Sequence, residues 1–269
     1  MGLRVNANLP AMNAARQSRR NVNALGVQLN RLASGLRINR AADNAAGLAI
    51  AEHFAAQVRQ YTQEANNLQT GVNALQTAEG GLAVQQEAVG RIRELAVQAA
   101  NGTMTDENRQ ALNQEAQQLI EQIGNVAERT EFNETQLLTG EIENLPLGTE
   151  AGNEININES TPEYLGIEDL DISTVEGANA AIEALDTANQ RVSRNRVGIG
   201  AQENRLERAI EQRAIGVEES AASESAIRDA DLARVTMEQT RSQILLQGDL
   251  SAMVQSNIVP QTALRLLGG

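Results

Sequence analysis

The chain has 269 residues with no cysteine, no lysine and one histidine, which excludes disulfides, thiolate nucleophiles, Schiff-base lysines and Walker-type phosphate loops. Aromatic residues make up only 1% of it, whereas Ala, Leu, Glu, Gln and Arg, the residues of long helices, are abundant, so an ordinary globular core is excluded. The formal net charge is −13 and is uneven: residues 131–190 hold fourteen acidic residues and no basic one, while residues 1–60 hold eight arginines and two acidic residues.

The first predicted helix begins near Pro10, whose missing N–H is tolerated at a helix start. Its apolar residues follow a 3-4-3-4 spacing, which is typical of a helical seam. This seam consists of Val22, Leu25, Leu29, Leu32 and Leu36.

A break is expected in the stretch LASGLRINRAADNAAGLAI, residues 32–50, before the next helix. Gly35 permits a sharp exit from one helix, and Gly47 permits close approach of backbone. Ser34 can bond locally, and Asp43 or Asn44 can cap the helix that follows.

Heptad spacing then predicts one long helix over residues 45–100, roughly 80 Å at 1.5 Å per residue. Asn101-Gly102-Thr103 should end it, because glycine commonly follows a helix C-terminus. A return helix capped by Thr105 follows, with Asp106 and Glu107 in its first turn.

Residues 131–176 change character, since they are acidic and contain short alternations such as EININ at 154–158. Loops or a small hairpin are expected there. Helical spacing resumes through residues 177–226 and again through residues 227–269, where Pro260 is expected to bend or end the last helix.

The pattern predicts an all-α fold: an elongated antiparallel helical bundle or coiled coil with paired terminal helices and a small irregular or β-hairpin insert. The two terminal helices would form a pair too thin to bury both of their apolar faces. Their remaining apolar surface implies self-association, and a head-to-tail contact that does not close gives a filament.

Enzyme, metal and nucleic-acid functions find little support. His53 follows Glu52 but has no second histidine for a zinc helix, and the acidic cluster at 163–176 lacks an EF-hand loop. The basic N-terminal region lacks interleaved aromatics for nucleic acid, and no run of about 18 apolar residues could span a membrane. The sequons at Asn133 and Asn158 are weak signals. No cofactor is expected.

The stretch at 32–50 closely resembles the N-terminal signature of bacterial flagellin, the filament subunit. The resemblance continues in NALQTAEGGL at 73–82, GRIRELAVQAANGT at 90–103, IGAQENRLERAI at 199–210, ESAIRDADLARV at 224–235 and QILLQGDLSAMVQSNIVPQTALRLL at 243–267. It covers both ends of the chain, roughly residues 1–140 and 177–269. The acidic middle is far shorter than in larger flagellins.

The resemblance implies four regions. Residues 1–34 and 227–269 would form a terminal coiled-coil filament core, residues 35–44 a spoke linker, residues 45–130 and 177–226 a helical rod, and residues 131–176 an acidic, surface-exposed insert. The core would use the N-terminal seam with Met237, Ile244, Val254 and Ile258. The spoke residues would be Gly35, Arg37, Asn39, Arg40, Asp43 and Gly47. Arg37 and Arg40 either reach acids on a neighbouring subunit or remain solvated.

The resemblance also implies partners. An export chaperone would contact Leu245, Leu246, Leu250 and Met253, a patch that also suits packing in the filament. A host Toll-like receptor would contact Arg91, Leu95 and Glu115, whose primary role would be packing between subunits. Gly90 replaces a commoner glutamine, which weakens the receptor assignment.

A flagellin would be a homopolymer meeting cap and junction proteins, with no nucleic-acid or membrane partner. It would be extracellular in the flagellum and secreted without a cleaved signal peptide, consistent with the start MGLRVNANLP, which lacks the apolar core of a secretory signal. The alternative is a hook-filament junction protein with similar terminal helices. An enzyme on a helical scaffold has almost no support.

Overall fold

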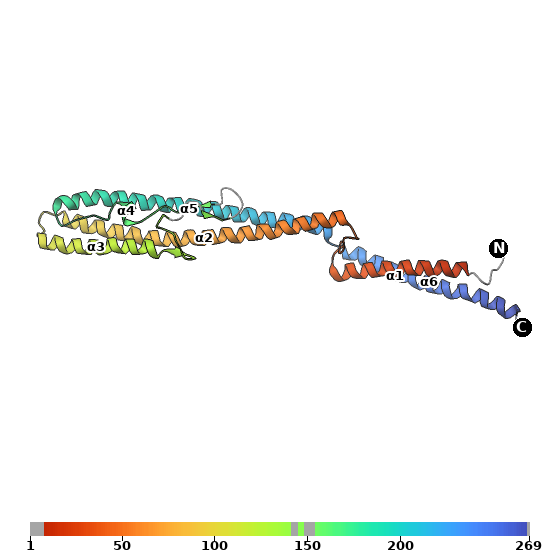
Figure 1. Ribbon diagram of the computed structural model, residues 1–269. Helices are drawn as coiled ribbons and strands as arrows, with labels where there is room; N and C mark the ends of the chain where they lie inside the picture. The colour runs from red at the N-terminus through yellow and green to blue at the C-terminus, as the bar shows by residue number, and fades with distance from the viewer. Residues whose placement is uncertain (1–7, 141–144, 148–153, 268–269) are drawn as a thin grey trace. The chain divides into compact units, whose positions relative to one another are not determined.

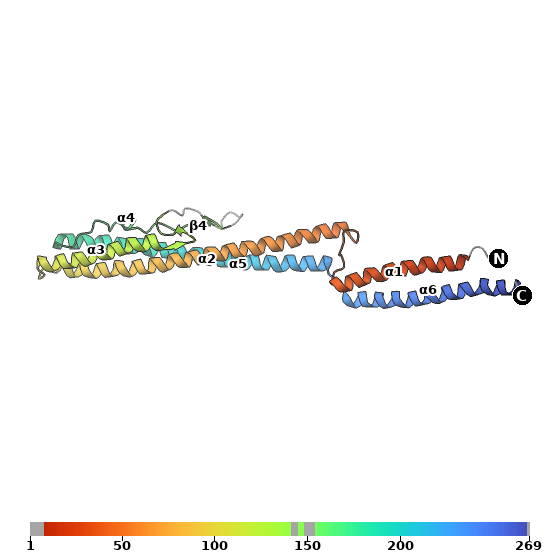
Figure 2. The same cartoon turned by 60° about the horizontal axis from the view of Figure 1, so that its bottom comes forward.

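The computed structural model describes residues 8–140, 145–147 and 154–267, which fold into two compact units (Figures 1 and 2). The terminal unit combines Met1–Val58 with Glu218–Gly269, and the central unit is Arg59–Val217. The division therefore falls inside two long helices, whereas the sequence placed it at the spoke. The predicted all-α class is confirmed, because helices dominate and the strands are two residues long.

Helices occupy most of the predicted segments. They are α1 (Leu9–Ser34), α2 (Ala45–Ala99), α3 (Asp106–Arg129), the short α4 (Pro162–Leu165), α5 (Val175–Arg228) and α6 (Leu232–Leu267). Two predictions about Pro260 and Leu36 need correction. Pro260 does not end α6, because this helix continues to Leu267. Helix α1 ends at Ser34, so Leu36 lies outside the helix to which its spacing assigned it.

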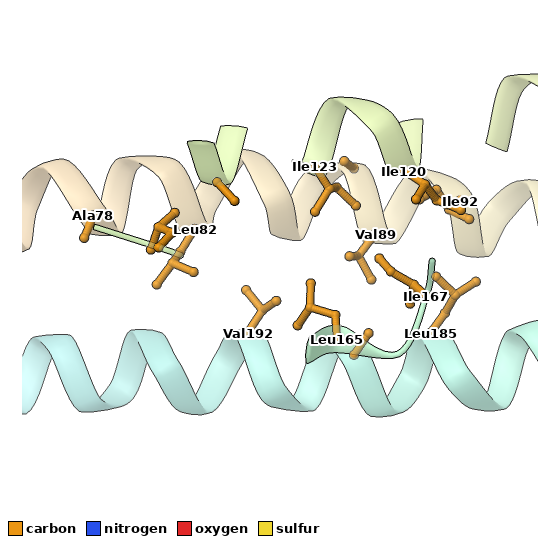
Figure 3. Close-up of a cluster of buried hydrophobic side chains, with 14 of the residues drawn as sticks. Ala78, Leu82, Val89, Ile92, Ile120, Ile123, Leu165, Ile167, Leu185 and Val192 are labelled. Atoms are coloured by element: carbon orange, nitrogen blue, oxygen red, sulfur yellow. The ribbon is translucent and has the colours of Figure 1, made fainter. Parts of the chain in front are cut away.

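The core of the central unit lies between α2, α3 and α5 (Figure 3). The predicted stripe of α2 is buried there, including Leu68, Leu75, Leu82 and Ile92, each at most 1% exposed. From the other two helices come Ile120, Ile123, Leu185 and Val192. Aliphatic side chains at heptad spacing thus fill the core without aromatic residues.

The turn between α2 and α3 lies where the sequence predicted it, but a different residue stabilises it. Gly102 is not in the left-handed conformation expected of a terminating glycine. Instead the buried guanidinium of Arg109 donates to the carbonyls of Ala99 (2.9 Å) and Asn101 (3.2 Å), and pairs with Asp106 at 2.7 Å. Arg109 therefore satisfies carbonyls that the end of α2 leaves without helical partners.

The predicted hairpin content of the insert is present as two small antiparallel pairs. Strand β1 (Glu131–Phe132) pairs with β2 (Thr135–Gln136), and β3 (Leu145–Pro146) pairs with β4 (Glu154–Ile155). Residues 141–144 and 148–153 lie outside the described part of the chain.

Several aliphatic residues of the insert are buried, although the insert was expected to be surface-exposed and Leu145 is 43% exposed. Ile155, Ile157, Leu165, Ile167 and Ile172 are all at most 2% exposed and join the core of the central unit. The alternation in EININ explains part of this arrangement, because successive side chains of an extended chain point to opposite sides. The apolar side chains therefore enter the bundle while Glu154 remains exposed.

We name residues 154–172 the strap, because this segment lies along the helices and is attached by side-chain to backbone hydrogen bonds. Gln202 of α5 accepts from the backbone N–H of Asn156 at 2.8 Å and donates to its carbonyl at 2.7 Å. Asn195 donates to the carbonyl of Glu159 at 3.1 Å, and Arg205 donates to that of Glu154 at 2.5 Å. Polar side chains of one helix thus take the place of a neighbouring strand.

Candidate assembly surfaces

Helices α1 and α6 lie side by side, and the seam between them contains hydrogen-bonded polar side chains as well as apolar ones. The carboxamide of Asn21, 9% exposed, donates to the carboxylate of Asp249 at 2.6 Å. Gln28 donates to Glu238 at 2.7 Å in the same seam. Asn8 caps α1 and donates to the carbonyl of Ser256 at 2.8 Å.

Many large apolar residues of the same two helices are exposed, although Val235 is buried. Val22 is 50% exposed, Leu29 46% and Leu32 37%. On α6, the exposed set is Met237, Ile244, Leu245, Leu250, Val254 and Ile258. An ordinary coiled coil buries most of its apolar residues between its helices, whereas this pair leaves much of its apolar surface exposed.

The predicted N-terminal seam is therefore only partly one surface. Val22, Leu29 and Leu32 form an outward face, while Leu25 is half-buried. Leu36 leaves the helical face, because Gly35 turns the chain away at φ 72° and Leu36 instead forms a β-bridge with Asp229.

Backbone hydrogen bonds connect the start of the spoke to the end of α1 and to the segment between α5 and α6. The N–H of Gly35 bonds to the carbonyl of Arg31 at 2.9 Å and closes the end of α1. The backbone N–H of Arg37 donates to the carbonyl of Arg228 at 2.6 Å, and that of Ala230 donates to the carbonyl of Gly35 at 2.9 Å. The guanidinium of Arg37 also donates to the carbonyl of Ile227. The spoke is thus attached to the connection between α5 and α6.

Asp43 organises the second half of the spoke. Its carboxylate accepts from the backbone N–H groups of Arg40 (2.9 Å) and Asn39 (3.0 Å), which hold the pKa of Asp43 below its usual value. Asn44 caps α2 by accepting from the N–H of Gly47 at 2.9 Å. A Cβ on Gly47 would approach the Ile38 side chain to 2.9 Å, so the close approach expected at Gly47 is present.

Two of the three predicted receptor contacts lie together on the central unit. Arg91 of α2 pairs with Glu115 of α3 at 2.9 Å and with Glu94 at 2.9 Å. The hydrogen bonds that the Arg91 guanidinium donates to the carboxylates of Glu94 and Glu115 raise the pKa of Arg91. The third assignment is wrong as a surface contact, because Leu95 is 1% exposed and packs in the core. Spacing by four residues did not place Arg91 and Leu95 on one exposed face.

The predicted chaperone patch is divided between two surfaces of α6. Leu245 is 45% exposed and Leu250 51% exposed on the outward side. Leu246 and Met253 are half-buried and share the heptad positions of the residues that meet α1. Next to Leu245 a shallow groove is lined by Thr236, Met237, Thr240, Arg241 and Ile244.

The residues considered for chemistry lie in ordinary structural settings. His53 is exposed, with its ring 6.2 Å from that of Phe54. Within residues 8–140, 145–147 and 154–267, no group of three or more metal-ligating side chains comes together, and no helix is both long and apolar enough to cross a membrane. At the second sequon, Asn158 donates to Asn195 at 3.3 Å and Ser160 is buried.

Comparison with known proteins identifies the family. A family model described as the bacterial flagellin N-terminal helical region matches residues 5–143, and one described as the bacterial flagellin C-terminal helical region matches residues 182–267. The chain belongs to the bacterial flagellins. Flagellins are structural proteins, so this chain is not an enzyme.

Relatives of this flagellin match it almost end to end. A flagellin from Halalkalibacterium halodurans is 40% identical, over 98% of this chain and 99% of its own. The flagellar filament core protein flaB2 from Brachyspira hyodysenteriae is 36% identical with the same two coverages. These relatives do not favour the junction-protein alternative.

Solved structures agree with the fold. The crystal structure of Bacillus cereus flagellin aligns with a TM-score of 0.50 at 27% identity, covering 55% of this flagellin and 88% of that chain. A putative flagellar hook-associated protein from Vibrio parahaemolyticus aligns with a TM-score of 0.52 at 15% identity, over 70% of this chain and 98% of that one. The second likeness concerns the fold alone.

Proposed function

We propose that this flagellin polymerises into the bacterial flagellar filament through the outward apolar faces of α1 and α6. The observation that carries the proposal is the large exposed apolar surface of the terminal pair, which includes Val22, Met237 and Ile244, beside a seam that contains hydrogen-bonded polar side chains. Such a surface is stabilised only when other copies cover it. Because the apolar faces belong to two different helices, the face of one helix can contact the face of the other helix in the next copy. Such a head-to-tail contact repeats without closing.

The test compares two substitutions on α6. Ile244→Asp places a charge on the outward apolar face, and Gln243→Asp adds the same charge at an exposed polar position next to it. Negative-stain electron microscopy after addition of ammonium sulfate and filament seeds should show long filaments of uniform width for wild type and Gln243→Asp, and none for Ile244→Asp. The proposal would be wrong if the two variants polymerised equally, or if the wild-type protein remained monomeric.

In the filament, the terminal helices α1 and α6 would form the innermost layer, and the spoke would lead from α1 to α2. Arg37 donates within its own chain, which leaves Arg40 as the spoke arginine proposed to meet an acidic residue of a neighbouring subunit. The insert would then lie outermost, and its exposed acidic residues would keep filaments apart by charge repulsion.

The chaperone proposal is narrowed to Leu245 and Leu250. Both are exposed on the outward face of α6, where a cytoplasmic chaperone would cover the apolar surface that later packs in the polymer. A Leu250→Asp variant is expected to weaken chaperone binding and polymerisation together. Loss of chaperone binding without loss of polymerisation, or the reverse, would show that the two processes use different surfaces.

Host-receptor recognition is proposed for Arg91 and Glu115 without Leu95. The two side chains are about half exposed and form one ion pair on the surface of α2 and α3. Binding of an ectodomain of the receptor to wild type and to Arg91→Ala, measured by surface plasmon resonance, tests this role. Unchanged affinity would leave the pair with a role within the subunit.

An extracellular location is proposed because the protein is proposed to form the flagellar filament. This flagellin would be exported unfolded through the flagellar apparatus without cleavage and would meet cap and junction proteins during assembly. Residues 1–7, on which the expectation about a secretory signal rests, lie outside the described part of the chain.

A further inference from the structure

The central unit carries an isolated apolar side chain on α5. Val197 is 73% exposed, more than any other exposed large hydrophobic residue of the described chain. Helical spacing places it between Arg194 on one side and Ala201 and Arg208 on the other, all exposed. The result is one apolar knob on a basic stripe of α5.

A groove of matching character lies on the outer side of α2 and α3. Gly80, Gly81 and Val84 line it from α2, and the α3 side contributes Gln118, Glu121, Gln122, Asn125, Val126 and Arg129. Gly81 packs against Thr130, but a Cβ added to Gly80 would meet no atom within 4 Å. Gly80 therefore leaves open space in the groove beside Val84, which is 43% exposed.

The two surfaces differ in charge. Glu121 lines the groove, and the exposed Glu87 lies one turn along α2 from Val84. In the described part of the chain, neither Glu87 nor Glu121 has an ion-pair partner, and the same holds for Arg194 and Arg208 of the basic stripe. Opposite charges that are unpaired within one subunit can pair between two. Arg129 at the end of the groove is the exception to its acidic character.

We propose that the central units of successive copies interlock, with Val197 of one copy entering the Gly80–Gly81–Val84 groove of the next. α5 contributes no residue to the groove, so knob and groove are different surfaces and the contact is heterologous. Such a contact repeats without closing, which is what a filament requires. The inference rests on the proposed polymer and adds a second contact, distinct from the apolar faces of α1 and α6.

The first test fills the groove. Gly80→Phe places a ring in its open space, while Gly90→Phe adds the same ring at another exposed helical glycine of α2 with nothing within 4 Å of its Cβ. Both variants should retain the helical circular dichroism of wild type. The critical concentration for polymerisation should rise at least tenfold for Gly80→Phe and change little for Gly90→Phe. Equal critical concentrations would overturn the contact.

The second test uses the absence of cysteine from the chain. Chains carrying Val197→Cys are copolymerised with chains carrying Gly80→Cys, treated with a short bis-maleimide and digested for mass spectrometry. The expected cross-link joins residue 197 of one chain to residue 80 of another, and exceeds that obtained when Val97→Cys, exposed on α2 outside the groove, replaces Gly80→Cys. Filaments without this preference would overturn the interlock alone. Failure of wild type to form filaments would overturn the proposed function and this inference with it.

Discussion

The side chain of Gln85 and residue Ser160 form a closed pair of hydrogen bonds inside the central unit. The carboxamide of Gln85 donates to the carbonyl of Ser160 at 2.9 Å and accepts from its hydroxyl at 2.6 Å. The same carboxamide donates to the carbonyl of Ile123 at 3.2 Å. Both residues are 0% exposed, so this one side chain connects α2, α3 and the strap where water cannot compensate for a lost bond.

Replacement of Gln85 by leucine should lower the free energy of unfolding by about 2–3 kcal/mol, because the carbonyl of Ser160 would remain buried without its donor. Urea unfolding followed by circular dichroism measures this change. Gln63→Leu on the exposed surface of α2 is the matched control and should alter stability by less than about 0.5 kcal/mol. Similar losses for the two variants would show that the buried network contributes little.

Arg109→Met should destabilise the turn between α2 and α3 by about 2–3 kcal/mol, since two carbonyls would lose a charged donor. Asp106→Asn should cost well under about 1 kcal/mol, because the Asp106 side chain is 89% exposed and its ion pair is screened by solvent. Thermal unfolding of both variants distinguishes two contributions to stability: the hydrogen bonds from Arg109 to the two carbonyls, and its ion pair with Asp106. A larger effect of Asp106→Asn would contradict this assignment.

Gly35→Ala should be unfavourable by about 1–2 kcal/mol, because φ is 72° at this position and a Cβ is strained there. Gly26→Ala, in the middle of α1 with open space around its Cβ, should instead stabilise the helix by about 0.5–1 kcal/mol. Hydrogen exchange of the α1 amides by mass spectrometry checks the opposite signs. Two changes of the same sign would disagree with the geometry of the spoke.

The spoke turn should weaken in acid. Because backbone N–H groups lower the pKa of Asp43 in the folded chain, its contribution to stability is fully present above the unfolded pKa and is lost as the pH falls through the lower folded pKa. Protection factors of the Asn39 and Arg40 amides, which are the exchange rates corrected for the intrinsic rate at each pH, should fall in wild type as NMR follows them from pH 6 to pH 2.5. Asp43→Asn should remove this transition, and its persistence would assign the effect to another group.

The seam between α1 and α6 should show coupling between its polar members. Asn21→Ala and Asp249→Ala each leave a partner without its hydrogen bond, so the double variant should cost less than the sum of the single ones by about 0.5–2 kcal/mol. A double-mutant cycle in assembled filaments, read from thermal disassembly, measures this coupling. Strict additivity would mean that the two side chains do not interact in the polymer.

The sequence by itself determined the positions of the long helices and several of their limits. Heptads at Leu68, Leu75 and Leu82 gave the long helix, and Thr105 and Asn44 are the caps that short-range chemistry indicated. These features depend on contacts within a few residues, which the order of residues specifies directly. The motifs of both ends also identified the family before any contact was known.

The tertiary structure alone decided which face of each helix meets which neighbour. The 3-4-3-4 spacing predicted the apolar seam of α1. It did not predict that Asn21 faces α6 while Val22 faces solvent. The interior position of Leu95 and the bond of Gln85 to Ser160 likewise depend on segments distant in the chain. Residue spacing shows which side chains share a face of a helix. Which of those faces is buried depends on the element that packs against it.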